Sequence, residues 1–220
     1  MAGLVVPPPG PEAGARGGTR LERKGRTRRA ILDAALMLSE DSGFGALSLR
    51  QVAKEVGIVP TAFYRHFDSL EALGLALVEE SFESLRAMLR DIRRGDPSYA
   101  DVVDLSIDTL VEHVHRQRTH FLFIARERAA GPPAVREEVR RDIELCEHDL
   151  ATDLAALPGT DAWSAADLRI LSNLIVTAMV ATAEAILNAT DPAEEQRVVG
   201  TARTQLRMVL IGALNWRSGS

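Results

Sequence analysis

The sequence predicts an all-α protein. Apolar residues recur at spacings of three and four along most of the chain, which is the period of an amphipathic helix. We find no segment with the period-2 alternation of a half-buried strand, and no internal repeat. Glycine and proline divide the helical pattern into segments, because both residues end helices readily. The clearest divisions are Gly43, Gly57, residues 95–97, residues 131–133 and residues 158–159.

The most informative stretch is 47–67, LSLRQVAKEVGIVPTAFYRHF, which predicts two short helices around a sharp turn. Ser48 is a candidate N-cap, since its hydroxyl can accept a free amide at a helix start. Gly57 suits the left-handed residue that ends a helix, and Pro60 suits the first turn of the next one. The predicted inner face of the first helix consists of Leu49, Val52, Ala53 and Val56.

The second of these helices separates buried from exposed side chains. Phe63 and Phe67 are four residues apart and can anchor the helix inward. The remaining side chains, Thr61, Tyr64, Arg65 and His66, point mostly outward and suit phosphates and base edges. The alternative is an ordinary helical hairpin with a polar face, but we favour a helix-turn-helix that places its second helix in the major groove of DNA.

Three domains follow from this pattern. Residues 1–22, rich in proline and glycine, are expected to be a disordered N-terminal arm. Residues 23–68 form a three-helix DNA-binding domain whose first helix spans about 23–41. Residues 69–220 form a helical ligand-binding and dimerisation domain, which begins directly after a cap at Asp68 or Ser69.

The last two predicted helices, which start near Ser164 and Asp191, hold many small residues among apolar ones. A helix that is apolar over much of its circumference is buried on more than one side. One interpretation is a central helix of a monomeric bundle. We favour a self-complementary homodimer face, packed as a four-helix bundle about a two-fold axis.

Charge is distributed unevenly along the 220 residues. The net charge is −5, but residues 1–70 carry +3 and residues 71–220 carry −8. The cations cluster before residue 31, where Arg26 and Arg28 are candidate phosphate contacts. We find no secretory signal and no apolar window long enough to span a membrane, and Cys146 is the single cysteine, so a cytoplasmic protein is expected.

Residues 23–75 resemble the TetR family of transcriptional regulators. The segments that carry the resemblance are 30–35, Gly43-Phe44, 47–58 and Phe63 to Phe67. Within the family, the chain looks most like the repressors of unsaturated fatty acid synthesis and desaturation. That narrower likeness involves GIVPTAFYRHF (57–67), LGLALVEES (73–81), FLFIARERAAG (121–131) and Trp216.

The resemblance implies a homodimer that binds a palindromic DNA operator through half-sites about 34–36 Å apart. Ser48 would touch phosphate, and Thr61, Tyr64, Arg65 and His66 would meet bases or backbone. Family members often carry a small hydroxyl residue at the position of Ala62 and a lysine at that of Leu70. Both are missing here, so Arg26 or Arg28 is expected to supply the charge.

On the ligand side, the resemblance implies a long apolar cavity within residues 69–190 that holds a fatty acyl chain, as acyl-CoA or acyl carrier protein. Apolar side chains suit such a chain, since each buried CH₂ contributes about 0.8 kcal/mol. Arg126 and Arg128, which follow the apolar run 121–124, are candidates to meet a phosphate or carboxylate head group, and a solvated helix face is an equal alternative for both. The candidate cavity residues are Phe82, Leu110, Val114, Phe121, Phe123, Leu150 and Met179.

Parts of the sequence also fit two other functions. The first is a TetR-type sensor of drugs or other hydrophobic small molecules. The second is a helical-bundle metal oxidase, because Glu112 and His115 have the Glu-x-x-His spacing of di-iron proteins. A second copy of that motif is missing, since Glu144 and His148 are four residues apart, and Cys146 lacks an obvious base. We therefore expect no enzyme, no metal and no cofactor.

Overall fold

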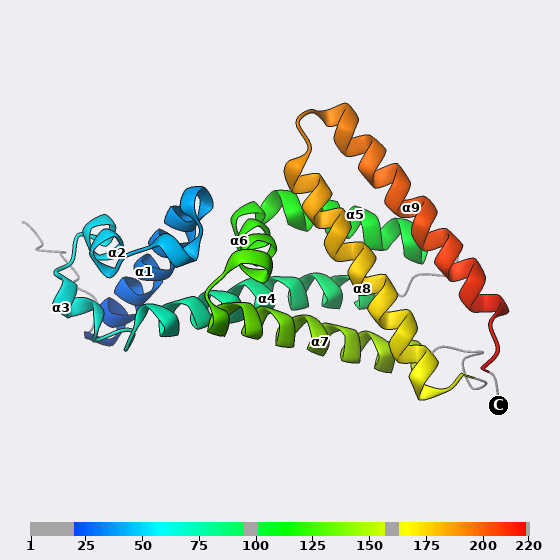
Figure 1. Cartoon of the computed structure of the whole chain (residues 1–220), viewed down its shortest axis with the longest axis horizontal. Helices are drawn as coiled ribbons and strands as arrows, with labels where there is room; N and C mark the ends of the chain where they lie inside the picture. The colour runs from blue at the N-terminus through cyan, green and yellow to red at the C-terminus, as the bar shows by residue number, and fades with distance from the viewer. Residues whose placement is uncertain (1–19, 95–100, 157–162, 219–220) are drawn as a thin grey trace, which may run out of the picture.

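A computed structural model of the chain describes residues 20–94, 101–156 and 163–218, and all regular structure within these ranges is helical, as predicted (Figure 1). The predicted N-terminal arm, residues 1–22, lies almost wholly outside the described residues. The helices are α1 (Arg20–Ser42), the short 3-10 helix η1 (Phe44–Ala46), α2 (Leu49–Val56), α3 (Pro60–Phe63), α4 (Leu70–Arg94), α5 (Val102–Arg116), α6 (Arg118–Ala130), α7 (Pro133–Ala155), α8 (Ala165–Asn188) and α9 (Pro192–Asn215).

The helix boundaries follow local signals in the sequence. The Ser48 hydroxyl accepts the amide of Gln51, and the Gln51 side chain accepts the amide of Ser48, which completes a capping box at α2. Gly57 ends α2 with φ of 72°, a left-handed conformation that glycine adopts without strain. Pro60 occupies the first turn of α3. The sequence predictions at these three positions are confirmed.

The first three helices, with η1, form a compact unit around a shared apolar core (Figure 1). Ile31 and Ala35 of α1, Val52 of α2 and Phe63 of α3 are each less than 1% exposed. Phe63 and Phe67 are both buried, so the predicted inward anchors are confirmed, but the helix expected to carry both ends at Phe63 and Phe67 follows the next turn. The helix α1 begins at Arg20, three residues before the expected start.

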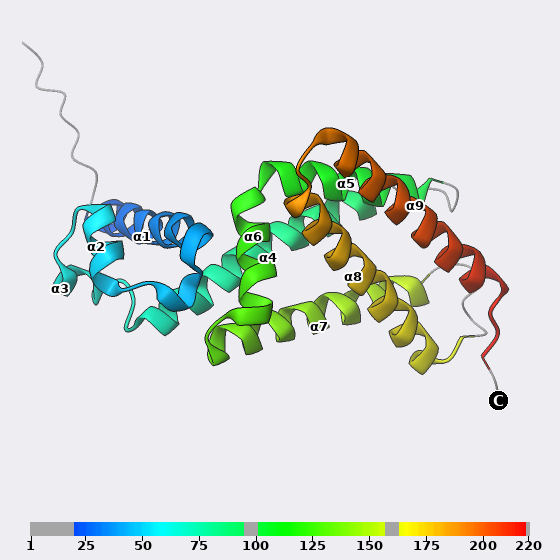
Figure 2. The same cartoon turned by 45° about the horizontal axis from the view of Figure 1, so that its top comes forward.

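The remaining helices form the body of the protein. Helix α4 leaves the N-terminal unit and runs into the body beside α7, and α8 and α9 pack together at the far end (Figures 1 and 2). Three of these helices, α4, α8 and α9, have a side-chain cap, since Ser69, Ser164 and Asp191 accept the amides of Ala72, Asp167 and Glu194. The predicted starts of the first and the last two helices of the body are therefore confirmed.

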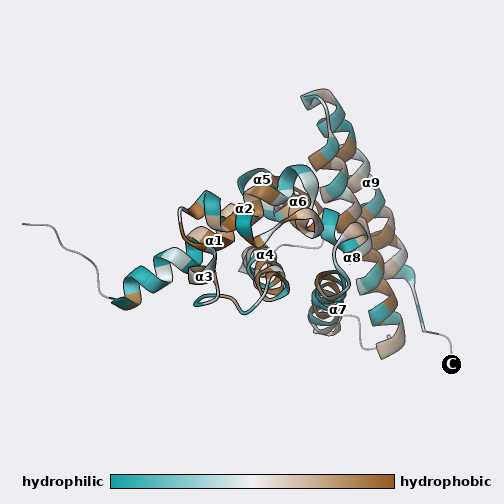
Figure 3. Ribbon diagram, turned by 60° about the vertical axis from the view of Figure 1, so that its left-hand side comes forward, coloured by the Kyte–Doolittle hydropathy of each residue, from teal (hydrophilic) through white to brown (hydrophobic). Residues whose placement is uncertain are grey.

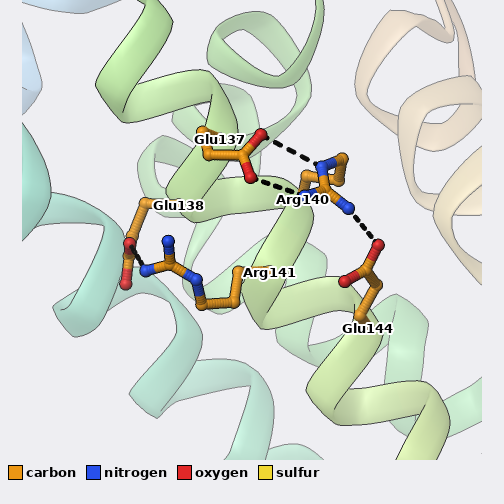
Figure 4. A network of polar contacts seen from close by, with 5 residues as sticks. All are labelled: Glu137, Glu138, Arg140, Arg141 and Glu144. Atoms are coloured by element: carbon orange, nitrogen blue, oxygen red, sulfur yellow. Dashed lines mark hydrogen bonds and ion pairs between the residues drawn. The ribbon is translucent and has the colours of Figure 1, made fainter.

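The outer face of α7 is charged. Arg140 pairs with Glu137 and Glu144, and Arg141 pairs with Glu138, one turn apart along the helix (Figure 4). These groups are largely exposed, so water and salt screen the pairs and they contribute little to stability. The pairs mark the solvent side of α7, whereas its opposite face supplies Val135, Val139 and Cys146 to the core.

Candidate nucleic-acid interface and ligand body

The exposed face of α3 carries the side chains expected to contact DNA. Thr61 and Arg65 are exposed, and Tyr64 is 57% exposed while its ring packs edge-on against buried Phe63 at 5.8 Å. The α-helix ends at Phe63, and the chain continues as a hydrogen-bonded turn in which the amides of His66 and Phe67 donate to the Phe63 carbonyl. The polar side chains are thus presented from a short and rigid element.

His66 lies in a strongly basic environment at the end of this turn. Burial lowers the pKa of its imidazole first, and the nearby cations Lys24, Arg28 and Arg65 lower that pKa further. Its Nδ1 is buried and has no hydrogen-bond partner among the described residues. The imidazole is therefore expected to be neutral at pH 7, in a cluster of cations that would attract an anion.

Arg28 connects α1 to the same turn. Its guanidinium lies 4.3 Å from the centre of the Phe67 ring, and Nη1 donates to the His66 carbonyl at 3.3 Å. A cation above an aromatic face contributes about 0.5–1 kcal/mol at an exposed site. Arg28 therefore braces the N-terminal unit internally, a role that the sequence did not predict. Arg26 is exposed on the same helix.

Ser48 is exposed at the start of α2, where backbone amides point outward. Its hydroxyl also donates to the Gln51 side chain at 2.7 Å. A helix start with free amides favours a phosphate. The structure thus places Ser48 where a phosphate contact is chemically reasonable, with its side chain already held in one position.

The expected ligand residues divide between two apolar clusters of the body. Phe82 and Phe123 belong to the cluster that reaches into the N-terminal unit. Leu110, Val114 and Phe121 belong to a second cluster between α5, α6 and α8, with Met179 packed at its edge. Leu150 is half-buried on α7. The structure therefore brings together two subsets of the predicted residues rather than one continuous lining.

Arg126, a candidate to bind the ligand head group, contacts the N-terminal unit in this structure. Its guanidinium donates to the carbonyls of Ser39, Glu40 and Asp41 at 3.0, 2.5 and 3.3 Å, all at the C-terminal end of α1. Arg128 instead pairs with Glu184 of α8. The sequence did not predict these contacts, because the partners of Arg126 are 85 to 87 residues away in the chain and leave no local pattern.

Glu127 is a buried carboxylate that the sequence did not single out. It is 1% exposed, and its Oε1 accepts the amide of Phe44 at 2.9 Å. Burial raises the pKa of this carboxyl above its usual value, while the Phe44 amide and Arg126 act in the opposite direction. Its place in the run Arg126-Glu127-Arg128 resembles an ordinary solvated helix face, which explains why it was missed.

The residues of the metal-oxidase alternative have other partners. Glu112 pairs with Arg116 at 3.0 Å, one turn along α5. His115 Nε2 lies 3.1 Å from Glu195 of α9. Neither the Glu112 nor the His115 side chain lies in a group of metal-ligating residues within the described ranges.

Comparison with known proteins relates the N-terminal unit to a family. Residues 31–77 match the model of the bacterial regulatory proteins of the TetR family. The whole fold is similar to a putative transcriptional regulator from Pseudomonas aeruginosa PAO1, with TM-score 0.69 and 18% identity over 89% of this chain and 95% of that one.

Two other solved structures have similar folds. One is a putative TetR-family transcriptional regulator from Syntrophomonas wolfei, with TM-score 0.70 and 12% identity over 87% of this chain and 98% of that one. The other is the fatty acid degradation regulator FadR from Bacillus halodurans, with TM-score 0.66 and 12% identity over 87% and 97%. At these identities the likeness concerns the fold.

Cys146 provides a test of the core of the body. Its thiol is 7% exposed, and burial, followed by the nearby Asp142, raises its pKa to about 11. Only about one thiol in a thousand is then ionised at pH 8, and the thiolate is the reactive form. We expect no reaction with a disulfide reagent in native protein at pH 8, and one equivalent after denaturation. Stoichiometric labelling of the native protein within minutes would contradict this burial.

Proposed function

We propose that this chain, in which residues 31–77 form a TetR-family DNA-binding domain, is a homodimeric transcriptional regulator that senses a hydrophobic ligand. Its DNA partner would be a palindromic operator, and its ligand a fatty acyl group such as acyl-CoA. The regulated genes would then belong to lipid metabolism, and the protein would act in the cytoplasm by binding rather than by catalysis.

The exposed face of α3 carries the proposal of operator binding. Thr61 lies on α3, and Tyr64 and Arg65 offer a phenol and a guanidinium from the turn that follows it; a major groove admits a helix of this width together with such a turn. Because Phe63 and Phe67 are buried beneath them, these side chains are held in place before DNA is bound. The basic first turns of α1 and the acidic body support one orientation of the molecule on a polyanion.

The exposed apolar side chains of α8 and α9 support the proposed dimer. Ile170 and Met208 are each 67% exposed, and an open groove of about 770 Å³ runs between the two helices. Small side chains such as Ala178, Ala181 and Ala185 line the groove, so a second helix can approach closely. A second copy of the same surface fits this shape, since a two-fold interface is self-complementary.

By length and composition alone, helix α8 is apolar enough to cross a membrane, which corrects the expectation from the sequence that no such window is present. Only 28% of its most apolar window is buried within the single chain. Figure 3 shows α8 packed beside α9, which alternates between hydrophilic and hydrophobic residues. A covered dimer face accounts for the apolar excess of α8 without a lipid bilayer.

The acyl ligand is supported by the composition of the body. Phe121, Leu110 and Val114 form an apolar cluster at the junction of α5, α6 and α8, and Met179 packs against it. One protein of similar fold is described as a regulator of fatty acid degradation. A sensor of drugs or other hydrophobic molecules uses the same kind of lining, so it remains the second candidate. The ligand would act by binding one orientation of the two DNA-binding domains more tightly than another.

Replacement of Tyr64 or Arg65 by alanine tests the DNA-contacting face. Each change should weaken binding to an operator selected from random duplexes by about 1–3 kcal/mol, roughly tenfold to a hundredfold, because a base or phosphate contact is lost. Sedimentation should show an intact dimer, and Arg140→Ala on α7 serves as a matched control. Normal binding by Tyr64→Ala at physiological salt would show that another surface reads the DNA.

The dimer is tested by Ile211→Asp, which places a carboxylate within the exposed apolar face of α9. Burial of an unpaired charge costs several kcal/mol, so this variant should sediment as a monomer and lose operator affinity. Leu145→Asp makes the same chemical change on α7, where the side chain is 51% exposed, and should remain dimeric. A dimer that tolerates Ile211→Asp would exclude this part of α9 from the interface.

The ligand class is tested by mass spectrometry of molecules that copurify with the protein. We expect acyl-CoA or free fatty acid, and a change in operator affinity when saturated and unsaturated acyl-CoAs are added. A typical coupling between two sites is about 5- to 150-fold. Recovery of an aromatic drug-like molecule would favour the second candidate. A protein that copurifies with no lipid and ignores every acyl-CoA would refute the acyl assignment.

A further inference from the structure

The last turns of α6 contact the DNA-binding domain at two separate elements. Arg126 donates to three carbonyls at the end of α1, and Glu127 accepts the Phe44 amide at the start of η1. Figure 2 shows the C-terminal end of α1 facing α6, which stands at the edge of the body. Two consecutive residues of α6 therefore contact the end of α1 and the start of η1, on either side of the connection between them.

Both contacts reach backbone groups where α1 ends and η1 begins; of the three carbonyls, that of Ser39 also accepts the amide of Gly43 at 3.0 Å. The last carbonyls of a helix lack intrahelical partners and form the negative end of its dipole, so the guanidinium of Arg126 suits them. The Phe44 amide begins η1, and a carboxylate acceptor makes a strong charge-assisted bond to it. Glu127 is 1% exposed, so removal of its oxygen would leave that amide buried without an acceptor.

An apolar contact reinforces the same junction. The Phe44 ring packs edge-on against Phe123 of α6 at 6.1 Å. It also fills a notch in α4, because a Cβ built at Gly74 would lie 2.6 Å from Phe44 and 2.7 Å from Val135. The notch exists only because residue 74 has no side chain. Phe44 is therefore enclosed by three helices of the body.

A third contact lies further back along α1. Arg29 pairs with Glu80 of α4 at 2.9 Å, and His120 near the start of α6 lies 3.7 Å from the same Glu80 oxygen. His120 is held by a hydrogen bond of 3.0 Å to buried Ser81. Helix α6 thus reaches α1 directly at its C-terminal end and through Glu80 at its middle.

We propose that Arg126 and Glu127 are positioning residues for operator binding, which fix the orientation of α2 and α3 relative to the body. The proposal rests on the function proposed above. It adds a second connection beside α4, and it assigns to Arg126 a role in place of ligand binding. The helix that carries the two residues also supplies Phe121 and Phe123 to the two apolar clusters of the body, so repacking of either cluster would shift the contacts to α1 and η1.

The test compares Glu127→Ala with Glu127→Gln in the full-length protein. Glutamine keeps an oxygen acceptor for the Phe44 amide and removes a buried charge, whereas alanine removes the acceptor. We expect the alanine variant to exchange the Phe44 amide proton about tenfold faster or more, and to bind operator about tenfold more weakly. The glutamine variant should restore both values to within about twofold of wild type.

Arg126→Ala should likewise weaken operator binding, because the end of α1 is released. Arg128→Ala is the matched control, since Arg128 lies two residues away on α6 but pairs with Glu184 of the body. Spin labels replace the exposed residues Lys54 of α2 and His148 of α7, and the distance between the two labels reports the orientation of α2 relative to the body. Labelled protein is diluted with unlabelled protein so that only distances within one chain are measured. The distance distribution should be narrow in wild type, in Glu127→Gln and in Arg128→Ala, and broad in Glu127→Ala and Arg126→Ala.

The outcomes separate this inference from the proposed function. If wild type binds no DNA, operator binding is wrong, while the amide exchange and the spin-label distances still report whether α6 holds the domain. If wild type binds operator and Glu127→Ala matches Glu127→Gln in all three measurements, the inference is overturned. Should Glu127→Ala fail to fold, Arg126→Ala against Arg128→Ala decides, and equal operator affinity and equal distance distributions in that pair overturn the inference as well.

Discussion

A single apolar core runs through both parts of the molecule. Ile31, Phe44 and Phe63 of the N-terminal unit belong to the same buried cluster as Leu77 and Phe82 of α4. Helix α4 leaves the first domain without a linker, and its inner face is continuous from one part to the other. Burial of large side chains is the main favourable term in folding, so the two parts are expected to fold and move as one body.

Polar contacts restrict the orientation of the two parts more narrowly than the shared apolar core does. An apolar cluster tolerates small rotations of its members, whereas a hydrogen bond to a buried carboxylate has a narrow range of geometry. The contact between Glu127 and the Phe44 amide therefore restricts the domain more sharply than the surrounding hydrocarbon. The guanidinium of Arg126, bonded to consecutive carbonyls, restricts the end of α1 in the same way.

The sequence predicted what local chemistry determines. The cap at Ser48, the left-handed Gly57 and the inward Phe63 and Phe67 depend on residues within a few positions of one another, and the structure contains each of them. The division of the ligand residues into two clusters depends on how separate helices pack, which periodicity does not encode. The contacts of Arg126 with the end of α1 were not predictable for the same reason, because a charged residue on a helix shows only that it avoids apolar surroundings, and not which distant group it meets.

The exposed apolar face of α8 and α9 has a thermodynamic consequence for the isolated chain. Ile211 and Leu214 are each more than 60% exposed, so part of the apolar surface remains hydrated after the single chain folds. If only folded chains associate and remove that surface from water, the stability of the folded state rises with the concentration of the protein. Dilution would then lower the melting temperature, and the cell would hold the least of the folded form when synthesis of the protein is slowest.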